Sequence, residues 1–520
     1  MSSLHRKTGL VSIGDVVYLP IIRISQHQYI RLVTQFNSAP WFEKIARQHG
    51  LKCPLTSGRL GWIALEVLKN ELDFRTPIFP RKKYSEPEWM NRLPGFARTY
   101  IRREYAISGG IDALGIIPHF PHMGFGYIVR DDGLASDAYQ TFHLHRLHDV
   151  RQLAFLHDPV IRENDRSAGT MMFDHTRFCH VMDVYAVANL ISENCRLGPQ
   201  DSTTLAVAAI SHDALTPAGG DTTKLVDPER FDEDANYHRL LVGQPWEKFQ
   251  EKYRIDRTLL IDTVLGKGLL GKILDLADKS SYLARDVVAY LGTAGPIKQK
   301  SFSPAYFMIA TLVEQNRNIC KLWDIVRVVG DDLVITQPDR LAAFLRLRAL
   351  MFSQLYYNPY SRFFEYLIGC AVIKHLYRTG VLTYQDLMTY GYEWLERKID
   401  EFFETDHVMR RFHNVEHSRI EEHPDYAAAC RRAAKFDRDE NVIAIVDTFG
   451  YPSNNATKRF KVMSRGRVMT FDQACPEAAE DIENLMRFPR LVRVYFFKCC
   501  DLDISPSARQ RIKEVVTALR

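Results

Sequence analysis

The sequence predicts a mainly α-helical protein of two or three domains, and three observations carry that prediction. The chain has 520 residues, which is more than a single hydrophobic core usually accommodates. Between residues 140 and 404, long segments repeat apolar residues at the spacing of a helix. Before and after this stretch the texture changes to short apolar runs with frequent Pro and Gly.

Composition excludes several classes of protein. The chain is 46% hydrophobic and 25% charged, close to the globular average and unlike a largely disordered chain. No apolar run reaches the roughly 18 residues of a membrane span, so we expect no membrane contact. The first residues lack the apolar core of a secretory signal, and the nine cysteines contain no CxxC pair. We therefore expect a cytoplasmic protein without a disulfide framework.

Residues 1–139 form the first predicted unit, a basic region of mixed structure. Within residues 1–110, 17 Lys and Arg accompany 8 Asp and Glu. Such a surface can face the phosphates of a nucleotide or a nucleic acid, and the alternative is an ordinary solvated surface. Residues 62–72 predict a helix here, and residues 77–126 predict loops and short strands.

Residues 140–404 form the second predicted unit, an all-α core, and residues 405–520 form a small α+β unit. Apolar residues recur at helical spacing in six segments of the core: 185–195, 202–213, 271–292, 339–357, 363–377 and 383–403. The last unit predicts strands at 441–449, 458–463 and 490–498 and helices at 476–486 and 507–519.

An apolar helix in the core ends on two ionisable residues, His212 and Asp213. Burying such groups without a partner is costly, and a bound cation would be a suitable partner. Two other predicted helices carry His180 and Asp278. Two imidazoles and two carboxylates make a mixed set of ligands for Mn²⁺, Fe²⁺, Ni²⁺, Mg²⁺ or Zn²⁺. The sequence therefore predicts a divalent metal site made by three helices.

Further polar residues lie next to these four. Tyr282 and Asp286 follow Asp278 at steps of four residues and share its helical face. Arg177 and Lys279 lie one turn or less from the predicted ligands and could clamp phosphate oxygens. A metal ion with two such cations is typical of phosphoester hydrolysis, because the metal lowers the pKa of its bound water and offsets charge on the phosphate.

The order H…HD…D on helices resembles the HD superfamily of metal-dependent phosphohydrolases. Four segments are more similar to one branch, the deoxynucleoside triphosphate triphosphohydrolases. HRLHDVRQL (145–153) resembles that branch's QRLRxIKQLG, and HTRFCH (175–180) resembles HxRFEHSLGV. ADKSSYLARD (277–286) resembles DxxDYxxRD, and residues 349–368 resemble LYxxVYxHxxxRxxExMI. The resemblance spans about 145–370 and does not cover 1–110 or 405–520.

The resemblance implies an HD-domain helical core and a role for each matching residue. The branch hydrolyses a dNTP to a deoxynucleoside and triphosphate and suggests a homo-oligomer. The implied metal ligands are His180, His212, Asp213 and Asp278. Phosphate contacts fall on Arg177 and Lys279, sugar contacts on Tyr282, Asp286 and Tyr356, and a contact to sugar and base on Gln152.

The sequence departs from that branch at three histidines, two of which support the metal ligands or transfer protons. Thr216 and Asp221 stand in place of two of these histidines, and Asn358 replaces a third. The acidic run 231–238 could supply a substitute through Glu233, Asp234 or His238. The predicted catalytic residues are therefore Arg177, Asp221 and His238.

These departures keep other readings open. The substrate could be a nucleoside monophosphate, a cyclic nucleotide or ppGpp, as in other HD branches. The core could also be a catalytically weak module that senses nucleotides or binds nucleic acid through the basic region. Among the remaining histidines, His175 could support a ligand, and a local cluster could contact phosphate or nothing: His143, His145 and His148.

Overall fold

The computed structural model describes most of the chain after residue 133. The described ranges are 134–153, 176–297, 304–316, 319–357, 362, 371–413, 419–436, 439, 441–447, 456–487, 491–498 and 505–517, together with five short strands between residues 11 and 80. This part of the chain is mainly helical, as predicted. No helix within it is both long and apolar enough to cross a membrane.

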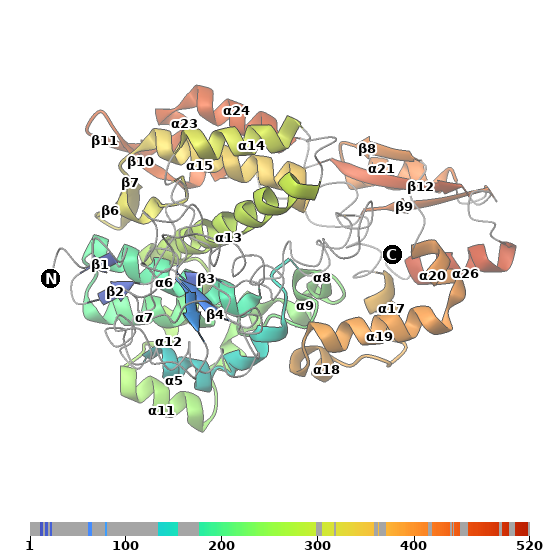
Figure 1. Cartoon of the computed structure of the whole chain (residues 1–520), viewed down its shortest axis with the longest axis horizontal. Coiled ribbons are helices and arrows are strands. Elements are labelled where there is room, and N and C mark those ends of the chain that lie inside the picture. The colour runs from blue at the N-terminus through green and yellow to red at the C-terminus, as the bar shows by residue number, and fades with distance from the viewer. Residues whose placement is uncertain are drawn as a thin grey trace.

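Three helices form the centre of the larger hydrophobic core: α6 (Arg177–Cys195), α7 (Pro199–Ser211) and α13 (Gly268–Ile297) (Figure 1). α6 packs against both α7 and α13. Residues 176–192, which include most of α6, are buried wherever burial is described, because this helix packs between its neighbours in the main hydrophobic core. The predicted helices at 185–195, 202–213 and 271–292 are thus confirmed.

Local signals explain where two helices of this centre begin. α7 follows Gly198 and has Pro199 in its first turn, where the missing N–H costs nothing. α12 (Arg257–Val264) begins after Asp256, whose carboxylate accepts hydrogen bonds from two backbone N–H groups of the first turn.

Shorter helices surround the centre. Before α12 lie α5 (Leu134–Thr141), η3 (Leu144–Asp149), α8 (Gly220–Lys224), α9 (Pro228–Phe231), α10 (Glu233–Asn236), η6 (Tyr237–Leu240) and α11 (Gln244–Tyr253). After α13 lie α14 (Pro304–Gln315), η7 (Leu322–Asp324), α15 (Pro338–Met351), the π-helical turn η8 (Phe352–Tyr356), α17 (Lys374–Arg378), α18 (Tyr384–Thr389), α19 (Tyr392–Thr405) and α20 (His407–His413).

A four-stranded sheet joins the helical core to the C-terminal residues. Its order is β11-β10-β7-β6, with β10 parallel to β7 and the other pairs antiparallel. β6 (Val326–Val329) and β7 (Asp332–Ile335) come from the predicted core, whereas β10 (Lys461–Ser464) and β11 (Arg467–Thr470) come from the predicted C-terminal unit. The pairing therefore crosses the predicted boundary at 404/405.

A second sheet has the order β8-β12-β9, all antiparallel. It consists of β8 (Arg419–His423), β12 (Val492–Lys498) and β9 (Val442–Val446). The central strand β12 is buried at six of its seven residues. The strands predicted at 441–449 and 490–498 are confirmed as β9 and β12. The strand predicted at 458–463 is confirmed only from residue 461, where β10 begins, because residues 458 and 459 end the short helix α22 (Ala456–Arg459).

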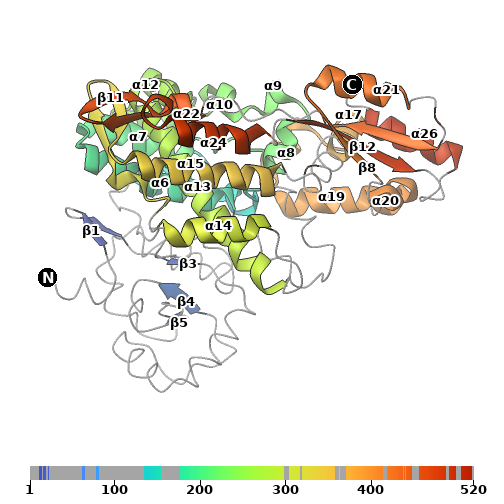
Figure 2. The ribbon, with the colours of Figure 1, turned by 90° about the horizontal axis from the view of Figure 1, so that it is seen from above.

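The C-terminal residues pack in two places (Figure 2). α24 (Pro476–Arg487) and α23 (Phe471–Ala474) join the core around α6 and α13, with α24 against α15. The second sheet shares a core with α19, α20 and α26 (Pro506–Thr517), while α21 (Tyr426–Ala434) packs on that sheet. α22 (Ala456–Arg459) precedes β10. The predicted helices at 476–486 and 507–519 are confirmed as α24 and α26.

Two helix predictions need correction. Residues 61–64, at the start of the helix expected over 62–72, form the strand β4 between β3 (Ile21–Ile22) and β5 (Ile78–Pro80). Val11–Ile13 and Val16–Tyr18 pair as β1 and β2. The helix predicted over 383–403 is divided into α18 and α19.

The division lies at Gly391, which has no room for a side chain. A capping box between Thr383 and Asp386 starts α18. Gly391 is extended and stands against the carboxylate of Asp149, so that a Cβ would overlap with that group. Asp149 in turn accepts a hydrogen bond of 3.4 Å from the backbone N–H of Glu393 at the start of α19. The close approach of η3 thus requires glycine here and ends the helical run.

Replacing Gly391 with alanine should lower the free energy of unfolding by about 1–3 kcal/mol, since the new methyl group must displace Asp149. Chemical denaturation measures this loss. In an Asp149→Ala background the same substitution should cost clearly less, because the obstacle is gone. An equal cost in both backgrounds would contradict the steric explanation.

Candidate metal centre

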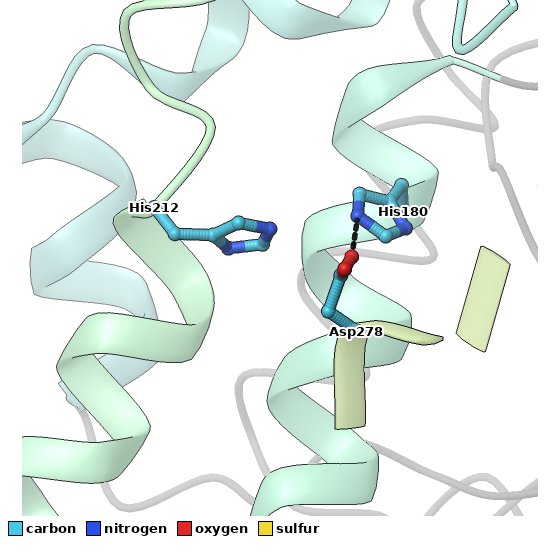
Figure 3. Close-up of side chains that lie close together, drawn as sticks. All are labelled: His180, His212 and Asp278. Atoms are coloured by element: carbon cyan, nitrogen blue, oxygen red, sulfur yellow. Dashed lines mark ion pairs between the residues drawn. The ribbon is translucent and has the colours of Figure 1, made fainter. Parts of the chain in front are cut away.

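Three helices bring His180, His212 and Asp278 together, as the sequence predicts (Figure 3). One ligand atom from each residue lies within 4.8 Å of the others. His180 lies in the first turn of α6, His212 follows the last residue of α7, and Asp278 lies in α13. The His180 Nε2 atom is 2.9 Å from Asp278 Oδ1.

A buried ion pair fixes two of these helices relative to each other. Arg285 of α13 contacts Asp183 of α6 through Nε at 2.7 Å and Nη2 at 2.5 Å. Both side chains are at most 6% exposed. Because the pair lies near His180 in sequence on one helix and near Asp278 on the other, it holds the two ligands in register. Because Arg285 pairs with Asp183, it is not the partner that explains the position of Asp278.

The imidazole of His212 is oriented as a metal ligand would be. Its Nδ1 atom lies 2.9 Å from the carbonyl oxygen of Ala209, to which an N–H at that position donates. The Nε2 atom is then the acceptor, and it points toward the other two residues (Figure 3). This atom is buried without a hydrogen-bond partner in the described part of the chain. A cation would satisfy it, as in metal sites where the second nitrogen is held by a carbonyl.

Asp213 completes the group of four predicted ligands. Its Oδ2 atom lies 3.7 Å from His180 Nε2 and 3.8 Å from His212 Nε2. The same oxygen accepts a 2.8 Å hydrogen bond from Arg177. Burial acts to raise the pKa of Asp213, but Arg177 and the two imidazoles outweigh it and hold the pKa well below its usual range. The carboxylate is therefore ionised and available to a cation.

His180 and Asp278 form a charged pair that a cation could replace. Burial acts to lower the pKa of His180, and the carboxylates of Asp278 and Asp213 more than reverse this, so the pKa is raised. Burial acts to raise the pKa of Asp278, and His180 lowers it below its usual value. A divalent cation bound here would take the place of the imidazole proton. The donor set of two imidazoles and two carboxylates thus fits such an ion.

A chain of alternating charges leads away from Asp213. Arg177 donates to Asp213 and, at 2.6 Å, to Asp221. Lys224 contacts Asp221 at 2.7 Å and also pairs with Glu233. Sequence reasoning named Glu233 as a possible acid or base but missed Lys224, which joins it to Asp221. Arg177 is oriented by carboxylates rather than toward open space, and its predicted role on phosphate stays a prediction.

The carboxylates of this chain differ in their pKa. Desolvation acts to raise the pKa of Asp221, but Arg177 and Lys224 lower it to about 2. Burial dominates at Glu233 and raises its pKa to about 7, with Asp213 and Asp221 adding to the rise and Lys224 opposing it. Lys224 contacts both carboxylates, and Asp221, which has the lower pKa of the two, is the one that stays ionised beside it. The Oε2 atom of Glu233 is buried with no hydrogen-bond partner among the described residues. Glu233 can therefore carry a proton near neutral pH, whereas Asp221 is ionised.

The other members of the acidic run are placed differently. His238 is exposed, and its Nδ1 atom lies 3.1 Å from the carbonyl of Ala235. Asp234 is close enough to His212 and Lys224 for their charges to lower its pKa, although desolvation leaves it raised overall. Glu233 is thus the buried acidic residue of this run, and the catalytic roles predicted for Asp221 and His238 stay predictions.

The predicted sugar-binding residues lie together further along α13. Tyr356, at the end of the π-helical turn, donates a 2.5 Å hydrogen bond to Asp286. The rings of Tyr282 and Tyr356 meet edge to face, 6.3 Å apart. Arg348 of α15 donates a 2.7 Å hydrogen bond to the Tyr282 hydroxyl. Sequence reasoning missed Arg348, and the available signal was its place eight residues before Tyr356 in the same predicted helix.

Two further residues were predicted to contact substrate: Lys279 and Gln152. Lys279 pairs with Asp275 one turn earlier in α13. Gln152 is buried, and its Oε1 atom has no hydrogen-bond partner in the described ranges. Gln152 lies close to the start of α6, since the adjacent Arg151 forms a β-bridge with Thr176. The substrate roles of Lys279 and Gln152 stay predictions.

Among the described residues, the positions where the similar proteins carry histidine and the other predicted histidines add no member to the group of His180, His212 and Asp278. Thr216 is fully buried, and Arg146 of η3 donates to its carbonyl at 2.5 Å. His148 stacks on Phe178 with ring centroids 3.9 Å apart. His143 and His145 meet edge to face, and neither joins the metal group. Two further residues lie outside the described ranges: His175 and Asn358.

Comparison with known proteins adds the fold alone. No protein-family model and no curated protein matches the sequence. A crystal structure of a hypothetical protein from Aquifex aeolicus is similar, with a TM-score of 0.51 and 16% identity, covering 78% of this chain and 100% of that one. A phosphohydrolase from Bacteroides thetaiotaomicron gives a TM-score of 0.47 at 14% identity, covering 72% of this chain and 97% of that one. The first likeness shows a shared fold.

Removing one ligand should abolish tight binding of a divalent cation. We expect Asp278→Ala and His212→Ala each to weaken Mn²⁺ binding by more than the roughly 10–100-fold that loss of a ligand's hydrogen-bond partner costs. Titration calorimetry measures the affinity, and the Mn²⁺-induced rise in Tm reports it independently. His238→Ala is the matched control and should bind Mn²⁺ like the wild type. Equal affinity in all variants would place the metal elsewhere.

Proposed function

We propose that this protein is a metal-dependent phosphohydrolase that acts on nucleotides, with dNTPs as substrates and a deoxynucleoside and triphosphate as products. The observation that carries the proposal is the meeting of His180, His212 and Asp278 beside Asp213, with a buried, unpartnered imidazole nitrogen directed into the group. A purely structural cluster would leave that nitrogen unsatisfied at a cost. A hydrolytic metal site gives it a partner.

In the proposed reaction, water attacks the α-phosphorus and the bond to the 5′-oxygen breaks. A divalent cation held by the four ligands would supply positive charge to the phosphate oxygens and lower the pKa of a bound water. Arg177 orients Asp213 and adds a fixed positive charge beside it. The leaving 5′-oxygen takes up a proton, and Glu233 Oε2 is the buried group that can hold one near neutral pH.

The residues on α13 and the π-helical turn support a sugar-containing substrate. Asp286 and Tyr356 form a hydrogen-bonded pair whose oxygen lone pairs can accept a hydrogen bond from a sugar hydroxyl. The resemblance of residues 277–286 to the dNTP-hydrolysing branch supports a deoxyribose. A monophosphate, a cyclic nucleotide or ppGpp would use the same metal group and is the alternative within this proposal.

A second candidate is a module that binds nucleotides without turnover. The observation that favours it is that both cations expected on phosphate, Arg177 and Lys279, are paired with carboxylates. We further propose that the protein assembles into a homo-oligomer. We also propose that residues 1–139 contact nucleic acid.

Product analysis separates these candidates. Purified protein is incubated with Mn²⁺, Mg²⁺, Ni²⁺ or Co²⁺ and with dNTPs, NTPs, monophosphates, cyclic nucleotides and ppGpp. We expect intact triphosphate and deoxynucleoside from dNTPs, and no product from Asp278→Ala. Orthophosphate from monophosphates would keep the metal chemistry and change the substrate. Metal binding with no turnover of any substrate would leave the binding module, and salt-dependent oligonucleotide binding would then be its signature.

The proton-donor role of Glu233 has a signature in the pH profile. Because its pKa is raised to about 7, kcat should fall as pH rises above 7 and the carboxyl loses its proton. Glu233→Gln should lower kcat by about 10²–10⁴-fold and remove this alkaline limb. Mn²⁺ affinity should not change, since Glu233 is not in the ligand group. A limb that persists in Glu233→Gln would assign the proton to another group.

A further inference from the structure

Two buried arginines contact Tyr357, the residue after the π-helical turn that carries Tyr356: Arg493 of the C-terminal sheet and Arg362. Arg493 of β12 is 0% exposed. Its Nη1 atom donates a 2.8 Å hydrogen bond to the carbonyl of Tyr357, the residue after the turn. Its Nε atom donates to Glu422 of the neighbouring strand β8 at 3.2 Å. Burying a guanidinium costs free energy unless hydrogen bonds compensate, and the carbonyl of Tyr357 and the carboxylate of Glu422 supply such bonds here.

A second arginine holds the same end of the turn. The guanidinium carbon of Arg362 lies 4.8 Å from the centroid of the Tyr357 ring. Arg362 also pairs with Asp447, which follows β9, at 3.2 Å. Both of these charged side chains are buried. Tyr357 is thus tied to two strands of the sheet β8-β12-β9.

The turn itself is an unusual backbone. The N–H of Tyr357 donates to the carbonyl of Phe352 five residues earlier, at 2.8 Å, the hydrogen bond of a π-helix. Such turns are rare and are found mostly at functional sites, because an α-helical turn would be more stable. Here the wider turn presents Tyr356 to Asp286 of α13. Fixing the carbonyl of Tyr357 from outside stabilises the turn in this form.

We propose that Arg493 is a positioning residue for nucleotide binding: by holding the carbonyl of Tyr357 it sets the π-helical turn, and so places the Tyr356 hydroxyl on Asp286 in the site of the helical core. The inference rests on the proposed function for its consequence, a change in substrate affinity. The C-terminal sheet then takes part in substrate binding although it contributes no ligand to the metal group.

The kinetic test compares Arg493→Met with Tyr356→Phe and with the double variant. Arg493→Met should raise the KM for a dNTP about tenfold and leave kcat within about twofold, since the contact is made equally in the ground and transition states. Arg493→Lys should give a smaller rise. The double variant should be no worse than the poorer single variant, because both changes remove the same contact. Effects that multiply would overturn the proposal.

A matched control comes from the same sheet. Arg432 of α21 makes a two-pronged ion pair with Glu421 of β8, at 2.6 and 2.8 Å, and does not contact the turn. Arg432→Met should therefore leave KM unchanged. An equal rise in KM for both variants would mean that general loosening of the sheet, rather than the hold on Tyr357, is responsible.

A spectroscopic arm does not depend on hydrolysis. With 3-fluorotyrosine in place of Tyr356, the fluorine NMR line reports the surroundings of that ring. In Arg493→Met and Arg493→Lys the line should move toward the position of the free amino acid, and in Arg432→Met it should not. A line that stays in place in both Arg493 variants overturns the positioning role. A shifted line in a protein that hydrolyses no nucleotide would overturn the proposed function instead.

Discussion

The carboxylate of Asp213 lies close to one guanidinium and two imidazoles, and the site depends on these contacts. Arg177 donates to it from one side, and the imidazoles of His180 and His212 approach within 4 Å from the other. A buried carboxylate needs such compensation, because removal from water disfavours its charge. The guanidinium keeps the carboxylate ionised, and the ionised carboxylate in turn makes the space between the imidazoles favourable for a cation.

Contacts between and within the surrounding helices hold the residues of this group in place. The ion pair between Asp183 and Arg285 fixes α6 against α13, so that His180 meets Asp278 rather than a neighbour one turn away. The carbonyl of Ala209 fixes the imidazole of His212. Breaking a buried ion pair by removing one partner usually costs about 3–5 kcal/mol. The ion pair therefore sets the register of the two helices without a bound cation.

The chain from Arg177 to Glu233 connects the metal centre with the segment after α7. Asp221 and Glu233 share Lys224, yet their pKa values diverge because Asp221 also faces Arg177 whereas Glu233 is more deeply buried. Two carboxylates with separated pKa values are the usual basis for dividing acid and charge-stabilising roles in a site. In this protein the charges of Arg177 and Lys224 keep the pKa of Asp221 low, while burial raises that of Glu233.

The sequence by itself determined the helical class, most element positions and the grouping of His180, His212 and Asp278, because apolar periodicity and an ionisable pair ending an apolar helix are local signals. It could not decide that Arg348 contacts Tyr282 or that Arg493 contacts the carbonyl of Tyr357, since in each pair the two residues are far apart in the chain. It also could not foresee that β6 and β7 of the core pair with β10, or that Asp149 divides a helix at Gly391. Those outcomes depend on which surfaces meet after folding, and that information lies only in the tertiary structure.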